Sequence, residues 1–186
     1  MTDPHALAAQ LDEDYQSVLE DLIPTDTALI LEWQKTTRLY QRIQDYLRHG
    51  YGDPRAQASA DQLADLIDRG HTRRPITAWR GVRSVGATFG NPPPQVGDTY
   101  RFIGLVAASL DRHIAITEFT TPAGPGGAAL FCLDIPIGTP SLWVAAAGNP
   151  AFRYQYELLL LSGTMATITA IEYAGTIPTI SMRVGA

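Results

Sequence analysis

The first candidate for a binding or catalytic residue is an arginine that lies inside an apolar stretch of the sequence. Arg80 interrupts the apolar run 77–82 and is followed by Gly81. A buried arginine needs a partner, so its guanidinium group is expected to bind an anion or a carboxylate. An arginine that faces solvent on an edge strand is the alternative, and this segment alone leaves both open.

Gln155 and Glu157 form a second candidate group. They are predicted to share one face of a strand that continues into the apolar run 158–161. A carboxylate on an apolar strand loses hydration free energy unless something binds it, which is typical of a cleft floor; a solvent-facing pair on a half-exposed sheet is the alternative. A third segment, 104–109, is an apolar strand that ends in small residues and Ser109, so a ligand or another backbone can approach it closely.

Other common reaction centres are disfavoured. Cys132 is the one cysteine and lies in a run typical of a buried strand, so it is expected to be inert and to form no internal disulfide. The glycine-rich stretch 124–127 lacks the Lys-Ser/Thr ending of a phosphate-binding loop. No metal is expected, because the histidines lack the spacing of zinc ligands: His5, His49, His71 and His113.

The elements that must position these residues are helices first and strands afterwards. Before residue 70, apolar side chains recur at steps of three and four, which predicts helices over about 4–22, 25–49 and 59–69. After residue 75, short β-branched and aromatic runs are separated by Gly and Pro clusters, which is typical of strands. The predicted strands cover 76–82, 99–109, 128–135, 141–145, 155–162, 165–173 and 176–184, with a short helix over 111–119.

This order favours an α+β fold over an alternating parallel sheet. One domain is predicted over residues 1–186, with a helical lead-in over 1–70 and a mostly β part over 76–186. The chain has 45% apolar residues, enough to form a core without disulfides.

The net charge of −5 disfavours charge-driven binding to nucleic acid. Apolar runs are too short to span a membrane, so no membrane partner is expected. The start Met1-Thr-Asp-Pro-His lacks the features of a signal peptide. We therefore expect action in the cytoplasm, or delivery into a target cell by specialised secretion.

Taken in order, the three segments resemble the toxin-type mono-ADP-ribosyltransferases, a class that includes the Rho-modifying exoenzymes. Its signature is an arginine, a Ser-Thr-Ser strand and a Glu/Gln-x-Glu strand, matched here by Arg80, by Ala107-Ala108-Ser109 and by Gln155-Tyr156-Glu157. The resemblance implies N-terminal helices packed on a core of two β-sheets that form an NAD cleft.

The resemblance extends to a helix that binds NAD. The family's helix motif is similar to Tyr-x-x-Ile-Asn-x-x-Leu-Arg, and the segment 40–48 matches it, with Gln44 in place of the asparagine. It assigns Arg48 to the NAD phosphates. Four further assignments follow from the family. Arg80 would bind NAD near its phosphates and nicotinamide ribose, and the Gly81 backbone would meet the nicotinamide amide. Ser109 is assigned to NAD binding, and Phe119 to the border of the nicotinamide pocket.

In this family, Glu157 matches the glutamate that marks catalysis. Gln155 occupies the position that distinguishes acceptors, and an amide there points away from an arginine acceptor. Phe152, in the loop 146–154, is assigned with Gln155 to acceptor recognition. Ala107 replaces the first serine of the strand, whose hydroxyl orients the glutamate in the family, so Glu157 is expected to be held less firmly.

The resemblance therefore implies a mono-ADP-ribosyltransferase that cleaves NAD, its substrate, without a metal. ADP-ribose would pass to a non-arginine acceptor, an Asn or Gln amide of a protein. Three alternatives stay open: a guanine nucleotide or nucleic acid as acceptor, NAD hydrolysis, and a catalytically weak module that binds NAD or a partner. The negative charge favours the protein acceptor. An immunity or inhibitor protein is a further open partner.

Overall fold

Helices and strands separate along the chain in the computed structural model, which describes residues 3–35, 37–51 and 53–185. Met1 and Thr2, on which the expectation of no signal peptide partly rests, lie outside these ranges. Within the ranges, every helix is too short or too polar to traverse a bilayer. The helices before the first strand are α1 (Pro4–Asp14), α2 (Gln16–Glu20), α3 (Pro24–Trp33), α4 (Leu39–His49) and α5 (Pro54–Arg69).

Two predicted helices are wrong as single elements. The helix over 25–49 is interrupted, because α3 ends at Trp33 and α4 begins only after Arg38, whose φ of 63° lies in the left-handed region. The helix over 4–22 is likewise divided into α1 and α2.

The start of α5 also differs from the prediction. Asp53 caps the helix, and its carboxylate accepts a hydrogen bond from the Ala56 amide at 2.8 Å. Pro54 then fits the first helical position, so α5 begins there rather than near residue 59.

The strands agree with the prediction within a few residues, with one exception. The strand over 99–109 is wrong as one element, because β2 ends at Arg101 and β3 begins at Val106. The strands are β1 (Ile76–Val82), β2 (Thr99–Arg101), β3 (Val106–Ser109), β4 (Ala129–Ile135), β5 (Ser141–Trp143), β6 (Glu157–Leu160), β7 (Met165–Glu172) and β8 (Thr179–Val184). The helices between them are α6 (Val85–Phe89), α7 (Arg112–Phe119), α8 (Val144–Ala147) and the 3₁₀ helix η1 (Pro150–Gln155).

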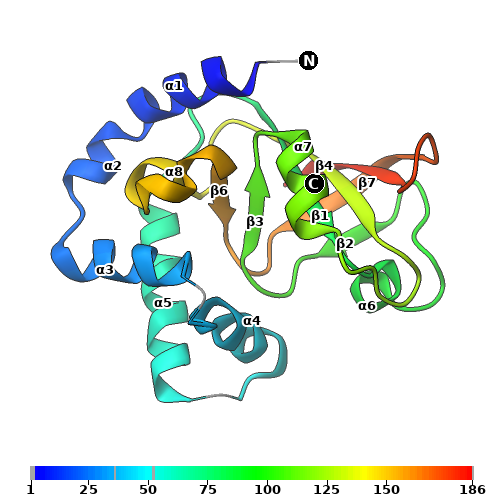
Figure 1. Ribbon diagram of the computed structural model, residues 1–186, viewed down its shortest axis with the longest axis horizontal. Helices are drawn as coiled ribbons and strands as arrows, with labels where there is room; N and C mark the ends of the chain where they lie inside the picture. The colour runs from blue at the N-terminus through cyan, green and yellow to red at the C-terminus, as the bar shows by residue number, and fades with distance from the viewer. Residues whose placement is uncertain (1–2, 36, 52, 186) are drawn as a thin grey trace.

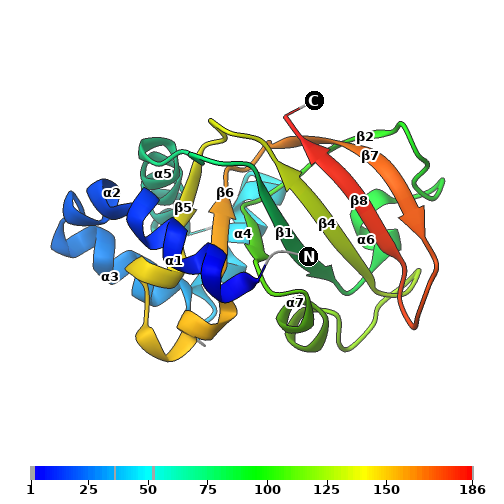
Figure 2. The same ribbon diagram turned by 90° about the horizontal axis from the view of Figure 1, so that it is seen from above.

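The strands form one hydrogen-bonded sheet in the order β2-β7-β8-β4-β1-β3-β6-β5 (Figures 1 and 2). β1 pairs with β4 along its whole length, but β1 and β3 are joined by the single pair Trp79↔Ser109. β3 pairs with β6 throughout, from Val106↔Leu160 to Ser109↔Glu157. The two predicted sheets are thus two well-paired halves that meet at one narrow junction.

Two apolar cores cover the two sides of β6. One core includes Leu11 of α1, Phe131 of β4 and Leu158 of β6. The other lies among α3, α4 and α5 and includes Ile43 and Leu159. Because adjacent strand residues point to opposite faces, β6 contributes to both cores. The predicted α+β fold with helices leading onto a β core is confirmed (Figure 1).

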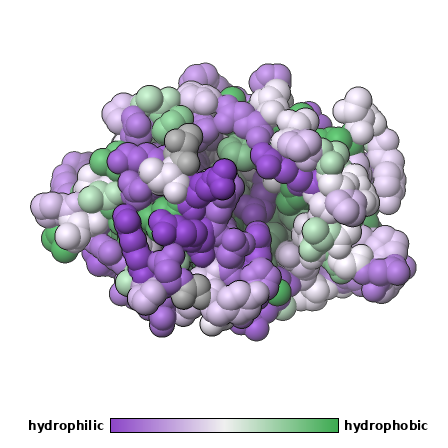
Figure 3. Space-filling model, turned by 60° about the horizontal axis from the view of Figure 1, so that its bottom comes forward, coloured by the Kyte–Doolittle hydropathy of each residue, from purple (hydrophilic) through white to green (hydrophobic). Residues whose placement is uncertain are grey.

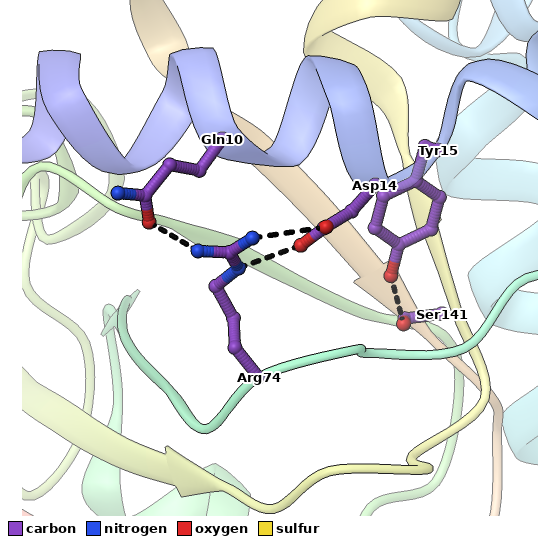
Figure 4. Close-up of polar contacts among 5 residues, drawn as sticks. All are labelled: Gln10, Asp14, Tyr15, Arg74 and Ser141. Carbon is purple, nitrogen blue, oxygen red and sulfur yellow. Dashed lines mark hydrogen bonds and ion pairs between the residues drawn. The ribbon is translucent and has the colours of Figure 1, made fainter.

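The side chains in Figure 4 attach α1 to the sheet. Arg74 precedes β1, and its guanidinium donates to both carboxylate oxygens of Asp14 at 2.6 and 2.9 Å and to Gln10 Oε1 at 2.5 Å. The buried Tyr15 hydroxyl bonds to the Ser141 hydroxyl at the start of β5. Burial raises the pKa of Tyr15 to about 12.

The raised pKa of Tyr15 leads us to expect that the free energy of unfolding decreases at high pH. Its pKa is 10.0 in the unfolded chain and about 12 in the folded protein, so stability is complete below pH 10 and falls as the pH rises toward 12. The difference corresponds to at most about 3 kcal/mol in the free energy of unfolding. Urea unfolding between pH 8 and 11.5 measures this decline, and Tyr15→Phe should lack it. Equal declines in both proteins would contradict the prediction.

Candidate active site

Arg80 lies where β1 and β3 separate. The two strands pair at Trp79↔Ser109 alone, and the Arg80 side chain reaches across the opening to donate from Nη1 to the Ala107 carbonyl at 2.7 Å. Among the described residues, no other group accepts a hydrogen bond from this guanidinium. Most of its donors are therefore free for a ligand.

Arg48 is carried by α4, which Gly50 ends in the left-handed conformation with a φ of 72°. Gln44, one turn earlier, donates from Nε2 to the Leu105 carbonyl at 2.8 Å and so fixes α4 beside the start of β3. Gly104 permits this approach, because a Cβ there would lie 2.2 Å from Gln44 Oε1. Gln44, at the position of the motif's asparagine, thus packs α4 against the sheet.

The two arginines influence each other. Burial, and then the positive charge of Arg48, lower the pKa of Arg80 to about 10, while Tyr100 and Glu157 act in the opposite direction. In the part of the chain that the structure describes, neither arginine has a carboxylate within 4.0 Å. Two neighbouring cations without a paired carboxylate form a site for an anion.

Glu157 is the first residue of β6 and lies opposite Ser109 of β3. Two residues before Leu159, it faces the core to which α3 contributes. The Trp33 indole donates from Nε1 to Glu157 Oε1 at 2.9 Å, and Gln34 donates from Nε2 to Oε2 at 3.4 Å. Both carboxylate oxygens are therefore held from the end of α3.

Trp33 and Gln34 are site residues that the sequence did not reveal. They supply two N–H donors to Glu157, where Ala107 lacks the expected hydroxyl, so the expectation of a poorly held carboxylate is corrected. Burial raises the pKa of Glu157, and the hydrogen bonds from Trp33 and Gln34 and the charge of Arg80 oppose this rise.

The placement of Gln155 on one strand face with Glu157 is wrong. Gln155 is the last residue of η1, and Tyr156, with a φ of 46°, turns the chain before β6 begins. The buried Ser109 hydroxyl donates to the Gln155 carbonyl at 2.6 Å and accepts from the Asp111 amide at 3.0 Å. Ser109 thus fixes the backbone beside the site, and its assignment to NAD binding stays a prediction.

Gly81 lets α7 pack closely on β1. A Cβ at this position would lie 2.2 Å from the Ala115 carbonyl and 2.8 Å from Phe119 Cβ, distances that no side chain tolerates. The Phe119 side chain remains 42% exposed. Gly81, which follows Arg80 in the sequence, and Phe119 of α7 therefore lie against each other. Their assignment to the nicotinamide pocket stays a prediction.

Phe152 lies half-buried in η1. Asn149 caps this helix by accepting a hydrogen bond from the Ala151 amide at 2.9 Å, and its own amide donates to Gln34 Oε1 at 2.7 Å. The Gln34 side chain therefore links the start of η1 to Glu157. The acceptor role of Phe152 stays a prediction.

Most of the predicted site residues come from β1, α4, η1 and β6 around the narrow junction of the sheet. The face of the molecule on the side of α4 is hollowed near its middle, where hydrophilic side chains gather (Figure 3). Two shallow grooves lie elsewhere, around 136–140 and among α3, α4 and α5, and neither is lined by Arg80 or Glu157. Among the residues described, no three His, Cys, Asp or Glu side chains are grouped to hold a metal ion.

A helical lead-in followed by a sheet that divides between β1 and β3 defines the ADP-ribosyltransferase fold, as predicted. Among solved structures, Plx2a, an ADP-ribosyltransferase toxin from Paenibacillus larvae, has a TM-score of 0.76 and 18% identity over 97% of this chain and 96% of that chain. The C3 exoenzyme of Clostridium limosum has a TM-score of 0.77 and 15% identity over 100% and 96%. C3stau2 from S. aureus, solved with NAD, has a TM-score of 0.74 and 16% identity over 99% and 96%. No protein-family model and no curated protein sequence matches the chain.

Removal of the Trp33 indole N–H is expected to change the pKa of Glu157. Its hydrogen bond stabilises the carboxylate, so Trp33→Phe should raise the already raised pKa of Glu157 further. Carbon-13 NMR titration of the glutamate carboxyl groups measures this change.

Trp143→Phe is the matched control, because it removes an indole N–H that bonds to Asp12 at 2.8 Å and belongs to the core on the other face of the sheet from Glu157. It should leave the Glu157 titration unchanged. A Trp33→Phe protein that is folded and titrates like the wild type would show that the indole does not orient this carboxylate.

Proposed function

We propose that the protein is a mono-ADP-ribosyltransferase that cleaves NAD and transfers ADP-ribose to a side-chain amide of a protein acceptor. The observation that carries the proposal is the meeting of Arg48, Arg80 and Glu157 around one junction, with no ion pair among them in the described part of the chain. The neighbouring structures with NAD or NADH support NAD as the substrate.

NAD has a negative pyrophosphate and a nicotinamide ring, and the site offers a group for each. Arg48 and Arg80 provide guanidinium donors for the phosphate oxygens. Gly81 and Phe119 lie together beside Arg80, where a nicotinamide ring would meet a backbone segment and an exposed aromatic edge. Arg80 is half-buried, so fewer water molecules compete with these contacts than on the open surface.

Cleavage of the nicotinamide–ribose bond develops positive charge on the ribose, and nicotinamide leaves with the electron pair of the bond. A fixed carboxylate stabilises that cation more than the ground state, because the opposite charge is complete only near the transition state. Glu157 has the required charge, and Trp33 and Gln34 fix both of its oxygens in advance. Their N–H groups leave the remaining lone pairs of the carboxylate available to a ribose hydroxyl.

The amide at Gln155 favours an acceptor that pairs with an amide, and Phe152 lies in the same short helix. A guanine acceptor is the second candidate, because a nucleobase edge pairs with an amide equally well. Water as the acceptor would make the protein an NAD hydrolase. A weak binding module is the least supported alternative, since Trp33 and Gln34 supply donors that the Ala107 strand lacks.

The place of action follows from the same proposal. Structural neighbours described as toxins favour delivery into a target cell over action in the producer's own cytoplasm. A protein with such an activity needs control in the cell that makes it, so an immunity or inhibitor protein is a proposed partner.

Glu157→Gln tests the catalytic role. The variant keeps the shape of the side chain and loses its charge, so kcat for nicotinamide release should fall by about 10²–10³-fold. The Kd for NAD, measured by calorimetry, should change little, because the carboxylate acts mainly in the transition state. Glu172→Gln, an exposed carboxylate at the end of β7, is the matched control. Equal turnover in both variants would reject the role of Glu157.

Arg48→Gln tests the phosphate site. The loss of one charged donor should raise the KM for NAD about 10-fold or more and leave kcat nearly unchanged. The wild-type affinity should also fall more steeply with salt than that of the variant. Arg183→Gln, which loses a surface ion pair with Asp134, should behave like the wild type. An unchanged KM in Arg48→Gln would remove Arg48 from the NAD site.

A further inference from the structure

Glu118, near the end of α7, holds the side chain of Gln155. Its Oε2 accepts a hydrogen bond from Gln155 Nε2 at 2.8 Å. The same carboxylate raises the pKa of the nearby Tyr154 phenol. In the described chain no cation lies within 4.0 Å of Glu118. The half-buried carboxylate is thus engaged by the neutral amide of Gln155 and lies near the neutral phenol of Tyr154.

This contact decides which way the amide of Gln155 points. A free glutamine can present either its carbonyl oxygen or its NH₂ group, because the two ends have nearly the same shape. A carboxylate only accepts hydrogen bonds, so the NH₂ end must face Glu118 and Oε1 must face away from it. The backbone of Gln155 is fixed as well, since Ser109 Oγ donates to its carbonyl at 2.6 Å.

We propose that Glu118 is a positioning residue that makes Gln155 present a hydrogen-bond acceptor, so that the group receiving ADP-ribose must be a nitrogen that carries hydrogen. The inference rests on the proposed transferase function and gives a chemical reason for its acceptor class. Carboxamides and the exocyclic amines of nucleobases meet the condition, whereas hydroxyl and thiol acceptors without a second hydrogen do not.

The chemistry needs two hydrogens on that nitrogen. One forms the hydrogen bond to Gln155 Oε1 and orients the nitrogen. The nitrogen lone pair forms the new bond to the ribose carbon as the bond to nicotinamide breaks, nicotinamide keeps the electron pair, and the second hydrogen leaves as a proton to solvent. The exposed aromatic ring of Tyr154 directly precedes Gln155 and offers a flat surface to a planar acceptor.

Charge reversal at Glu118 provides the test. In Glu118→Lys the ammonium donates to Gln155 Oε1, which turns the NH₂ end toward the acceptor. Transfer to nitrogen probes (an asparagine peptide and guanosine) should fall by about 10-fold or more in kcat/KM for the acceptor. Nicotinamide release without acceptor should stay within about twofold, because Glu118 acts through Gln155 and not on NAD. Glu172→Lys makes the same charge change at an exposed site and should alter neither rate.

A swapped pair distinguishes orientation from structural support. In Gln155→Glu with Glu118→Gln, the new amide donates to the new carboxylate, and an oxygen again faces the acceptor. Transfer should recover to within a few-fold of the wild type. Failure of the swap to restore transfer, or an equal loss of nicotinamide release in Glu118→Lys, would overturn the assignment.

Mass spectrometry of a lysate treated with the wild-type protein and NAD locates the modified atom. Nitrogen is expected, and modification at oxygen or sulfur would overturn the inference. Release of nicotinamide with free ADP-ribose as the sole product would also overturn it, while leaving NAD cleavage intact. Absence of nicotinamide release from the wild type would instead contradict the proposed function, and the acceptor assignment with it.

Discussion

The site depends on holding opposite charges near one another without letting them pair. Glu157 and Arg80 influence each other's ionisation, and Arg48 adds a second positive charge, yet no ion pair joins them among the described residues. An internal pair would satisfy these groups and leave little for the proposed substrate NAD, which has a negative pyrophosphate and would develop positive charge on its ribose. Neutral groups hold each charge instead: the Ala107 carbonyl for Arg80, and indole and amide N–H groups for Glu157. The folded chain bears the cost of this burial, which is typical of a binding site.

The separation of β1 from β3 makes this arrangement feasible. If the two strands paired beyond Trp79↔Ser109, their backbone groups would bond to each other and the Ala107 carbonyl would have no need of Arg80. Pairing of β1 with β4 and of β3 with β6 keeps both halves rigid on either side of the opening. The helices complete the site, since α4 carries Arg48 and the end of α3 supplies the donors to Glu157, so the lead-in helices belong to the site as well as to the fold.

Features with a local cause could be predicted from the sequence. The strand over 76–82 and the capped helix α7 agree with the structure, because alternation and capping involve neighbouring residues. Arg80 and Glu157 were singled out from an ordered motif. The predicted placement of Gln155 on one strand face with Glu157 was wrong, because Tyr156 adopts a left-handed conformation that few non-glycine residues take. The contact of Trp33 with Glu157 spans 124 residues and is set by packing of two cores, so no local spacing contains it. Sequence therefore identified the charged groups and missed the neutral groups that hold them.

Gln34 connects two parts of the site that the motifs treat as separate. Its Oε1 accepts from the Asn149 amide at the start of η1, and its Nε2 donates to Glu157. Because the amide is planar and rigid, a shift of η1 toward an acceptor must either move the Glu157 carboxylate or break one of these bonds. A glycine at position 148 leaves room for the Gln34 side chain, because a Cβ there would lie 2.1 Å from Gln34 Oε1. Glu157, the proposed catalytic carboxylate, and the segment that carries Gln155 are thus held in one geometry by a residue outside every motif, and removal of that amide would loosen both together.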